Sequence, residues 1–173
     1  MLNIQAPKAI TQRIHKDQAV KIKLEVDTEP PLHFQTENII RLNPRAHSIH
    51  AFTLPSLFAG KMHAVLCRAW GNRPKGRDWY DLVWYLANDV KLDLNHLQAR
   101  LEQSCKFLEA EQISIPAELT RENVIQLLEQ RIASLDIQKA KADVLPFISD
   151  ARELELWSPE FFTSVVQGIK VEH

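Results

Sequence analysis

The hydrophobic pattern of the chain changes from β-type to helical near Pro55. Residues 20–28 alternate strictly between apolar and polar, which predicts a strand with one apolar and one polar face. Pro30 and Pro31 end this strand, because proline lacks the N–H group that a sheet ladder needs. Further extended segments are expected at about 38–42 and 47–54. The first third of the chain is therefore predicted to be β-structure.

After Pro55 the apolar residues recur at helical spacing. This spacing predicts helices over about 55–70, 78–88, 95–110, 121–135, 137–149 and 159–168, the fifth interrupted by Pro146. Thr120 and Ser158 stand where they would cap two of these helices. Trp79 and Trp84 are expected to pack in the core, with stacking on nucleic-acid bases as the alternative. The fold class is therefore α+β, a small sheet followed by helices.

Composition and charge limit the classes of protein to which the chain can belong. A chain of 173 residues with a formal charge of -1 has room for one sizeable core and no overall field that attracts nucleic acid. No apolar run approaches the roughly 18 residues of a membrane span. Cys67 and Cys105 stand singly in apolar helical patterns, without C-x-x-C spacing, so we interpret them as packing residues of a reduced, cytoplasmic protein.

Two carboxylates share the polar face of the first predicted strand. Glu25 and Asp27 are two residues apart, and the period of a strand places them on one side, roughly 7 Å apart. Carboxylate oxygens at this spacing suit Mg²⁺, and Lys23 lies beside them. The alternative is an ordinary water-facing strand surface, and the pattern alone does not decide between the two.

Positive charge is concentrated between residues 61 and 77. This segment has five cationic residues and no acidic one, a net charge of +5. They are Lys61, Arg68, Arg73, Lys75 and Arg77. The first two share a helix face, and the last three lead into the N-terminus of the next helix, where an anion is stabilised. The segment predicts a phosphate-binding site for a nucleotide or a nucleic-acid backbone.

The acidic residues that follow this segment leave alternatives open. Asp78 could cap the second helix while the cations are simply solvated. Asp78 and Asp81 are three residues apart and share a face, so they could instead pair with Lys61 or Arg68 across the two helices. Both arrangements make the carboxylates neighbours of the basic segment.

Three segments carry a resemblance to a known family. They are K-I-K-L-E-V-D-T-E-P-P (21–31), L-P-S-L-F-A-G-K-M-H-A-V-L-C-R (54–68) and G-N-R-P-K-G-R-D-W-Y-D-L-V-W-Y-L (71–86). Together they resemble the AbiEii/AbiGii-type nucleotidyltransferases, toxins of bacterial abortive-infection and toxin–antitoxin systems. The resemblance implies a polymerase-β-like fold, with residues 1–54 as part of the nucleotidyltransferase sheet domain and residues 55–173 as a helical C-terminal domain.

The resemblance also implies roles for individual residues. Lys61 and Asp78 would be catalytic, the lysine binding the triphosphate and the aspartate orienting the lysine or the acceptor. One of Glu25 and Asp27 would be a metal-binding carboxylate. The phosphate-binding residues would be Lys23, Arg68, Arg73, Lys75 and Arg77, with Asp81 in support. The implied reaction is transfer of a nucleotide from an NTP to an acceptor such as tRNA, assisted by Mg²⁺, and a cognate antitoxin is an implied partner.

The chain departs from the family pattern at its beginning. Such enzymes carry a glycine-rich turn and a strand with paired aspartates, G-G/S…D-x-D, whereas residues 1–19 contain one acidic residue, Asp17, and no glycine. We therefore expect the C-terminal portion of a longer protein, inactive alone. The alternative is a non-catalytic module that binds nucleic acid or an antitoxin. An incomplete sheet would also expose an apolar edge and favour a homo-oligomer.

Overall fold

A computed structural model describes residues 24, 26–69, 74–103, 105, 108–109 and 113–173. The chain divides into two units, residues 1–30 and 31–173, and each is described by itself. Most of the strand predicted at 20–28 lies outside the described residues. Its described members Leu24, Val26, Asp27 and Thr28 are in no strand, so the prediction is wrong for them. The expected domain boundary at residue 54 stays a prediction.

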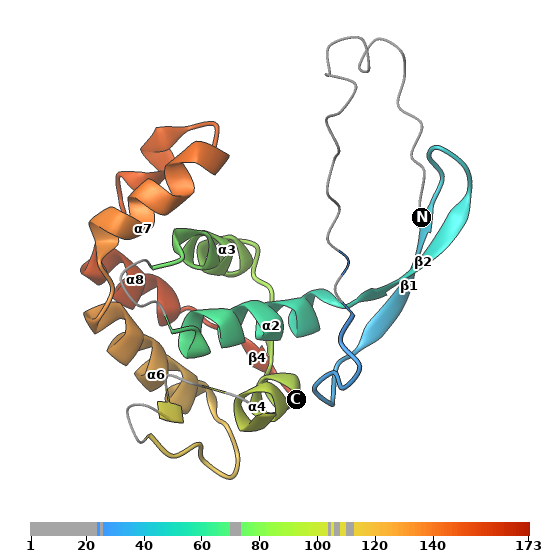
Figure 1. Cartoon of the computed structure of the whole chain (residues 1–173), viewed down its shortest axis with the longest axis horizontal. Coiled ribbons are helices and arrows are strands. Elements are labelled where there is room, and N and C mark those ends of the chain that lie inside the picture. Colours follow the sequence, from blue (N-terminus) through green and yellow to red (C-terminus); the bar gives the residue numbers. More distant parts are fainter. Residues whose placement is uncertain (1–23, 25, 70–73, 104, 106–107, 110–112) are drawn as a thin grey trace. The chain divides into compact units, whose positions relative to one another are not determined.

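The second unit opens with a β-hairpin. Strand β1 (Thr36–Arg41) pairs antiparallel with β2 (His47–Phe52), with Thr36 opposite Phe52. Both segments were expected to be extended, and this is confirmed. The hairpin leads directly into helix α2 (Leu54–Cys67) (Figure 1). The N–H of Thr53 donates to the carbonyl of Gln35 at 3.0 Å, which continues the pairing up to the start of the helix.

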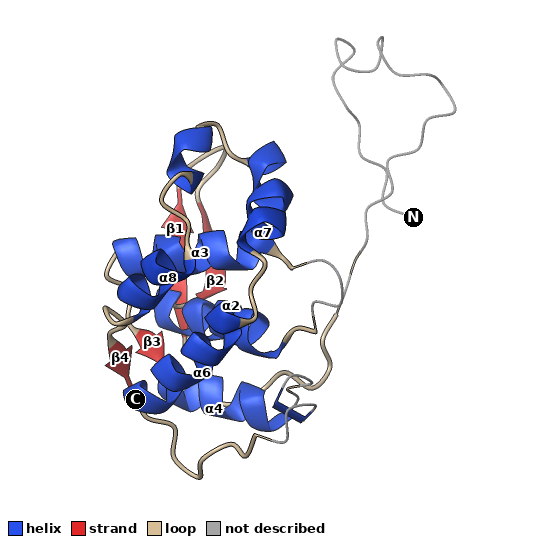
Figure 2. Cartoon of the chain, turned by 90° about the vertical axis from the view of Figure 1, so that its left-hand side faces the viewer, coloured by secondary structure: helices blue, strands red, loops and turns tan. Residues whose placement is uncertain are grey.

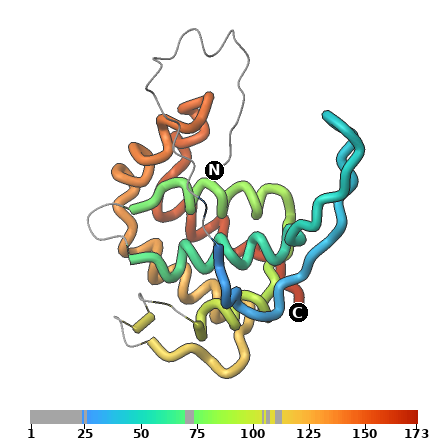
Figure 3. The backbone as a smooth tube through the Cα atoms, turned by 45° about the vertical axis from the view of Figure 1, so that its right-hand side comes forward, coloured from blue at the N-terminus to red at the C-terminus, as the bar shows by residue number. Residues whose placement is uncertain are grey.

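Helix α2 is the centre of the helical part. It contacts α3 (Gly76–Ala87), α4 (Leu94–Gln103) and α6 (Arg121–Ala133), and Figure 3 shows α2 and α3 running side by side. The later elements are α7 (Ile137–Val144), the 3-10 turns Leu145–Phe147 and Ala151–Leu154, and α8 (Pro159–Val166). None of the described helices has the length and apolar character needed to cross a membrane.

Two short strands pair between the middle of the chain and its C-terminal segment. Strand β3 (Leu92–Asp93) lies between α3 and α4 and pairs in parallel with β4 (Val171–Glu172) near the C-terminus (Figure 2). Neither strand was predicted, because a two-residue strand has no periodicity to detect. The pairing joins segments that are far apart in the sequence. The described residues therefore form a mixed α/β fold that is mainly helical.

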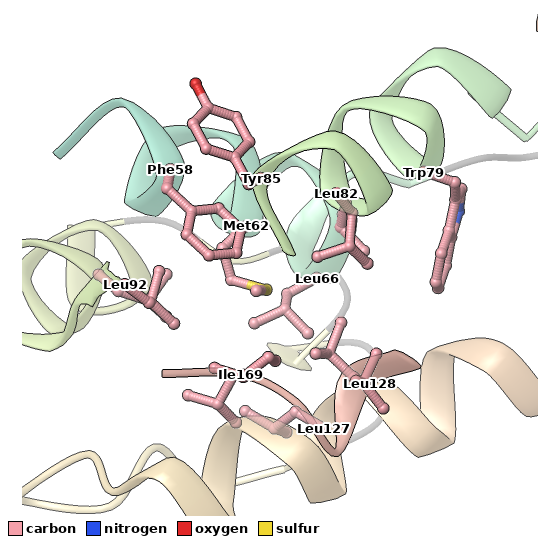
Figure 4. Packing of buried hydrophobic residues seen from close by; sticks show 14 of the residues in the cluster. Phe58, Met62, Leu66, Trp79, Leu82, Tyr85, Leu92, Leu127, Leu128 and Ile169 are labelled. Atoms are coloured by element: carbon pink, nitrogen blue, oxygen red, sulfur yellow. The ribbon is translucent and has the colours of Figure 1, made fainter. Parts of the chain in front are cut away.

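The core gathers side chains from α2, α3 and α6 (Figure 4). Phe58 of α2 stacks on Tyr85 of α3, with ring centroids 4.6 Å apart. Trp79 is fully buried, as predicted, but Trp84 is 47% exposed, so its predicted place in the core is wrong. Adjacent helical residues point in different directions, and here Tyr85 faces the core in place of Trp84.

The starts of α6 and α8 and the end of α7 follow the sequence signals. The Thr120 side chain accepts from the N–H of Asn123, and the Asn123 side chain accepts in return from the N–H of Thr120, a complete capping box. Ser158 likewise accepts from the N–H of Phe161. Helix α7 ends just before Pro146, where a 3-10 turn replaces it. Local signals therefore suffice to set these boundaries.

The two cysteines correct the sequence interpretation. Both are buried, as expected of packing residues, but Cys67 and Cys105 are joined in a disulfide with their Cα atoms 4.6 Å apart. The bond ties the end of α2 to the segment that follows α4. The partners are 38 residues apart in sequence, so no local spacing predicts the disulfide. The packing of α2 against α4 brings the two cysteines together.

Candidate functional site: a basic cavity between α2, α3 and α7

A cavity of about 320 Å³ lies beside the start of α3. It is lined by Lys61, Arg68, Lys75, Arg77, Asp78, Tyr80, Asp81, Val144, Phe147 and Ile148. The six charged residues of this lining are all among those that the sequence singled out. The structure therefore brings most of the predicted basic segment, and both of its acidic neighbours, to one place.

Two helices position the charged groups. Lys61 lies within α2 and Arg68 directly follows it, whereas Asp78 and Asp81 lie in the first turns of α3. The buried Arg131 of α6 fixes the end of α2, donating from Nε to the carbonyl of Val65 at 3.1 Å and from Nη2 to the carbonyl of Arg68 at 2.8 Å.

Lys61 of α2 and Arg68, which follows this helix, each pair with a carboxylate of α3. The Nζ atom of Lys61 lies 2.6 Å from Oδ2 of Asp81, and Nη1 of Arg68 lies 2.6 Å from Oδ2 of Asp78. This is the pairing across two helices that the sequence offered as one alternative. The other alternative is wrong, because Lys75 occupies the N-cap position of α3 and the helix has no side-chain cap.

Burial sets the properties of Asp78. Its side chain is only 9% exposed. Burial raises the pKa of Asp78, and the positive charges of Arg68 and Lys61 oppose this rise. The cationic neighbours therefore stabilise the charged form of Asp78, and its carboxylate holds the Arg68 guanidinium at the cavity wall.

Arg77 of α3 contacts α7 and the 3-10 turn that follows it, on the other wall of the cavity. Its Nε atom lies 3.9 Å from Oδ2 of the buried Asp143, and its guanidinium carbon lies 4.4 Å from the centroid of the Phe147 ring. Tyr80 donates from its hydroxyl to Glu153 at 2.7 Å. Sequence reasoning missed Arg131, Asp143, Phe147 and Glu153, because each meets the site only through tertiary packing.

The arrangement suits an anion. Four cationic side chains face two carboxylates in the lining, so the wall is positive overall. The side chains of Lys61, Arg68 and Arg77 are each about half exposed and can therefore turn towards a bound group. Guanidinium and ammonium groups beside the first N–H groups of a helix stabilise phosphate.

Four predicted site residues are not among the described residues that line this cavity. Lys23, Glu25 and Arg73 lie outside the described residues. Asp27 belongs to the unit of residues 1–30, where its Oδ1 atom accepts from the N–H of Glu29 at 3.1 Å. Within the described part of the chain, no three histidine, cysteine or acidic side chains gather in a way that could hold a metal ion.

Comparison with known proteins places the chain in a family. Neither a curated protein nor a solved structure shows a significant match to it. Residues 2–164 match the family described as nucleotidyl transferase AbiEii toxin, type IV toxin–antitoxin system. This match spans every residue of the basic cavity. The chain therefore belongs to the AbiEii nucleotidyltransferase toxin family.

Proposed function

We propose that the basic cavity binds the triphosphate of an NTP for the nucleotidyltransferase reaction of an AbiEii toxin. One observation carries the proposal: Lys61, Arg68, Lys75 and Arg77 line the same cavity. Ammonium and guanidinium groups gathered in one cavity are the side chains that bind the phosphates of a triphosphate, although Lys61 and Arg68 also pair with Asp81 and Asp78. In this proposal residues 1–54 contribute to a polymerase-β-like sheet domain, and residues 55–173 form the helical C-terminal domain.

Lys61 and Asp78 have the central roles in the proposed site. The triphosphate takes the place of Asp81 at the ammonium group of Lys61, since both are anions within reach of one cation. Asp78 keeps Arg68 at the cavity wall, where the guanidinium meets a second phosphate. Arg73 and Lys23 are assigned to the same phosphates on sequence grounds alone, and Asp81 supports Lys61 when no ligand is bound.

Only one of the two proposed metal-binding carboxylates, Asp27, is among the described residues. One of Glu25 and Asp27 would supply an oxygen ligand for Mg²⁺, and the described histidine, cysteine and acidic side chains form no group that could hold a metal ion. We therefore assign no step of the reaction to the metal. Because the sequence also lacks a D-x-D segment, we propose that the chain alone binds nucleotide weakly and does not transfer it.

The partners follow from the proposed reaction. The acceptor of the nucleotide is a nucleic acid such as tRNA, the reaction takes place in the cytoplasm, and a cognate antitoxin opposes the toxin. We keep homo-oligomer formation through an exposed sheet edge as a further proposal. The β1–β2 hairpin offers such an edge, since most of its residues are exposed.

A second candidate function is favoured by the same cavity. Its cations would hold the backbone of a nucleic acid as readily as a free triphosphate, because both present phosphate oxygens. A non-catalytic module that binds nucleic acid or an antitoxin therefore remains the alternative. It differs from the first proposal in predicting no preference for a triphosphate over a monophosphate.

A binding experiment tests the proposal. Calorimetric titration of the full chain with each NTP should show binding that the double variant Lys75→Ala, Arg77→Ala weakens by about tenfold or more. Lys170→Ala is the matched control, because this lysine pairs with Asp89 and does not line the cavity. Equal NTP affinity in the double variant and the control would contradict the proposal, and equal affinity for NTP and NMP would favour the alternative.

A transfer assay tests the proposed inactivity. The chain is incubated with labelled NTP, Mg²⁺ and total tRNA, with and without a segment that carries the glycine-rich turn and D-x-D residues. We expect incorporated label only when that segment is present. Label incorporated by the chain alone would show that it has a complete catalytic site.

A further inference from the structure

A second cavity adjoins the first along α2. It has a volume of about 310 Å³ and lies between α2, the end of β2 and α4. Lys61, Arg68 and Asp78 line both cavities. The two cavities therefore meet along one row of charged residues, and a ligand in each would share these residues.

Arg100 brings a further cation to the second cavity. Its Nε atom donates to Nε2 of His96 at 3.1 Å, and Nδ1 of His96 donates to the carbonyl of Leu32 at 2.7 Å. A carbonyl oxygen only accepts, so the proton of the neutral imidazole is on Nδ1 and Nε2 is free to accept from the arginine. His96 is buried and thus fixes the guanidinium in place.

The guanidinium lies against α2. A Cβ atom built on Gly60 would lie 3.4 Å from Nη2 of Arg100, which places the guanidinium directly beside this turn of the helix. Lys61 is the next residue of α2 and Arg68 is two turns further along. Three cations thus line one wall of the cavity.

The other part of the lining is apolar. Phe52, at the end of β2, and Leu57 of α2 both line the cavity and are each 42% exposed. An exposed aromatic ring beside guanidinium groups is the combination that binds a nucleotide, since the base stacks on the ring and the phosphate meets the cations. The first cavity has the rings of Phe147, over which Arg77 already lies, and of Tyr80, whose hydroxyl donates to Glu153.

We propose that the second cavity is a subsite for one nucleotide unit of a nucleic-acid strand, with its phosphate on Arg100 and its base on Phe52. This inference rests on the proposed function, because it places the acceptor strand next to the NTP.

Anisotropy titration of a fluorescein-labelled single-stranded RNA with the full chain tests the inference. We expect Arg100→Ala to weaken RNA binding by about tenfold and Phe52→Ala by at least about fivefold, while Phe52→Trp retains binding. NTP affinity should stay within about twofold in all three variants. Arg152→Ala is the control, since this arginine pairs with Asp150 and lines neither cavity. RNA affinities equal to the control in Arg100→Ala and Phe52→Ala would overturn the inference.

Cross-linking of the unaltered chain gives a second readout that does not depend on the folding of variants. RNA carrying 4-thiouridine should cross-link to peptides that contain residues 52–64 or 96–100, and cross-links confined to other peptides would overturn the inference. Displacement of the RNA by AMP at comparable concentration would show that the occupant is a free nucleotide and not a strand. If RNA binding depends on Arg100 but NTP binding is absent, the proposed function fails while the subsite stands.

Discussion

Gly76 is required by a close approach of two helices. A Cβ atom built on this residue would lie 1.9 Å from the carbonyl oxygen of Ala140 in α7, a distance that no packing tolerates. We expect Gly76→Ala to lower the free energy of unfolding by about 2 kcal/mol or more, measured by urea denaturation. Gly60→Ala is the control, because alanine favours the helix interior and meets only the flexible Arg100 side chain. Equal effects of the two substitutions would contradict the close packing of Gly76 against α7.

Asp93 joins four segments by hydrogen bonds. The N–H of Gln35 donates to Ser56 Oγ, and Ser56 Oγ and the N–H of His96 both donate to the buried Asp93 carboxylate, each at 2.9 Å. We expect Asp93→Ala to cost about 2–4 kcal/mol of stability, because buried donors lose a charged acceptor. Ser56→Ala should cost about 1 kcal/mol. Thermal unfolding of both variants checks this order, and a larger loss in Ser56→Ala would contradict it.

His96 makes the stability of the fold depend on pH. Burial lowers the pKa of His96 from its ordinary value of 6.5, so the folded chain favours the neutral imidazole. This contribution is complete above about pH 6.5 and declines as the pH falls towards the lowered pKa, because the unfolded chain then binds the proton more readily. Urea denaturation at about pH 7.5 and pH 5 should show a smaller loss in His96→Gln than in the wild type. An equal loss would contradict the assignment.

At the scale of elements, the sequence predicted those helices, strands and helix ends that are determined by neighbouring residues. The hairpin strands, α2 and the capped starts of α6 and α8 all follow from side-chain periodicity, proline and capping residues. Strands β3 and β4 and the exposure of Trp84 depend on distant partners, and the sequence pattern missed them. The same division applies to the candidate site. The charged residues of α2 and α3 were predicted because they are close in sequence, whereas Arg131 and Asp143 were not.

The disulfide is the element-scale feature with the largest predicted energetic effect. It closes a loop between residues separated by 38 positions, for which loop-closure entropy gives about 3–4 kcal/mol of stabilisation. We expect a reducing agent to lower the unfolding midpoint of the wild type accordingly. The double variant Cys67→Ala, Cys105→Ala should unfold at the lower midpoint with or without reductant. A wild-type midpoint that does not respond to full reduction would show that the bond contributes nothing.

At the scale of the molecule, two cavities share one charged row of α2 and α3. Lys61 and Arg68 line both and pair with Asp81 and Asp78 of α3. An arrangement of this kind lets two phosphate-bearing ligands bind next to each other. The family match and the basic cavity thus support one account, in which the α2–α3 pair is the nucleotide-binding part of an AbiEii toxin.

Hydrogen–deuterium exchange of the full chain with and without an NTP tests this account most directly. Because the triphosphate would bind the end of α2 and the start of α3, we predict slower exchange in peptides covering residues 61–81, and little change in α6 and α8. Exchange that is unaltered across residues 61–81 at a saturating NTP concentration, or protection confined to other segments, would contradict the account.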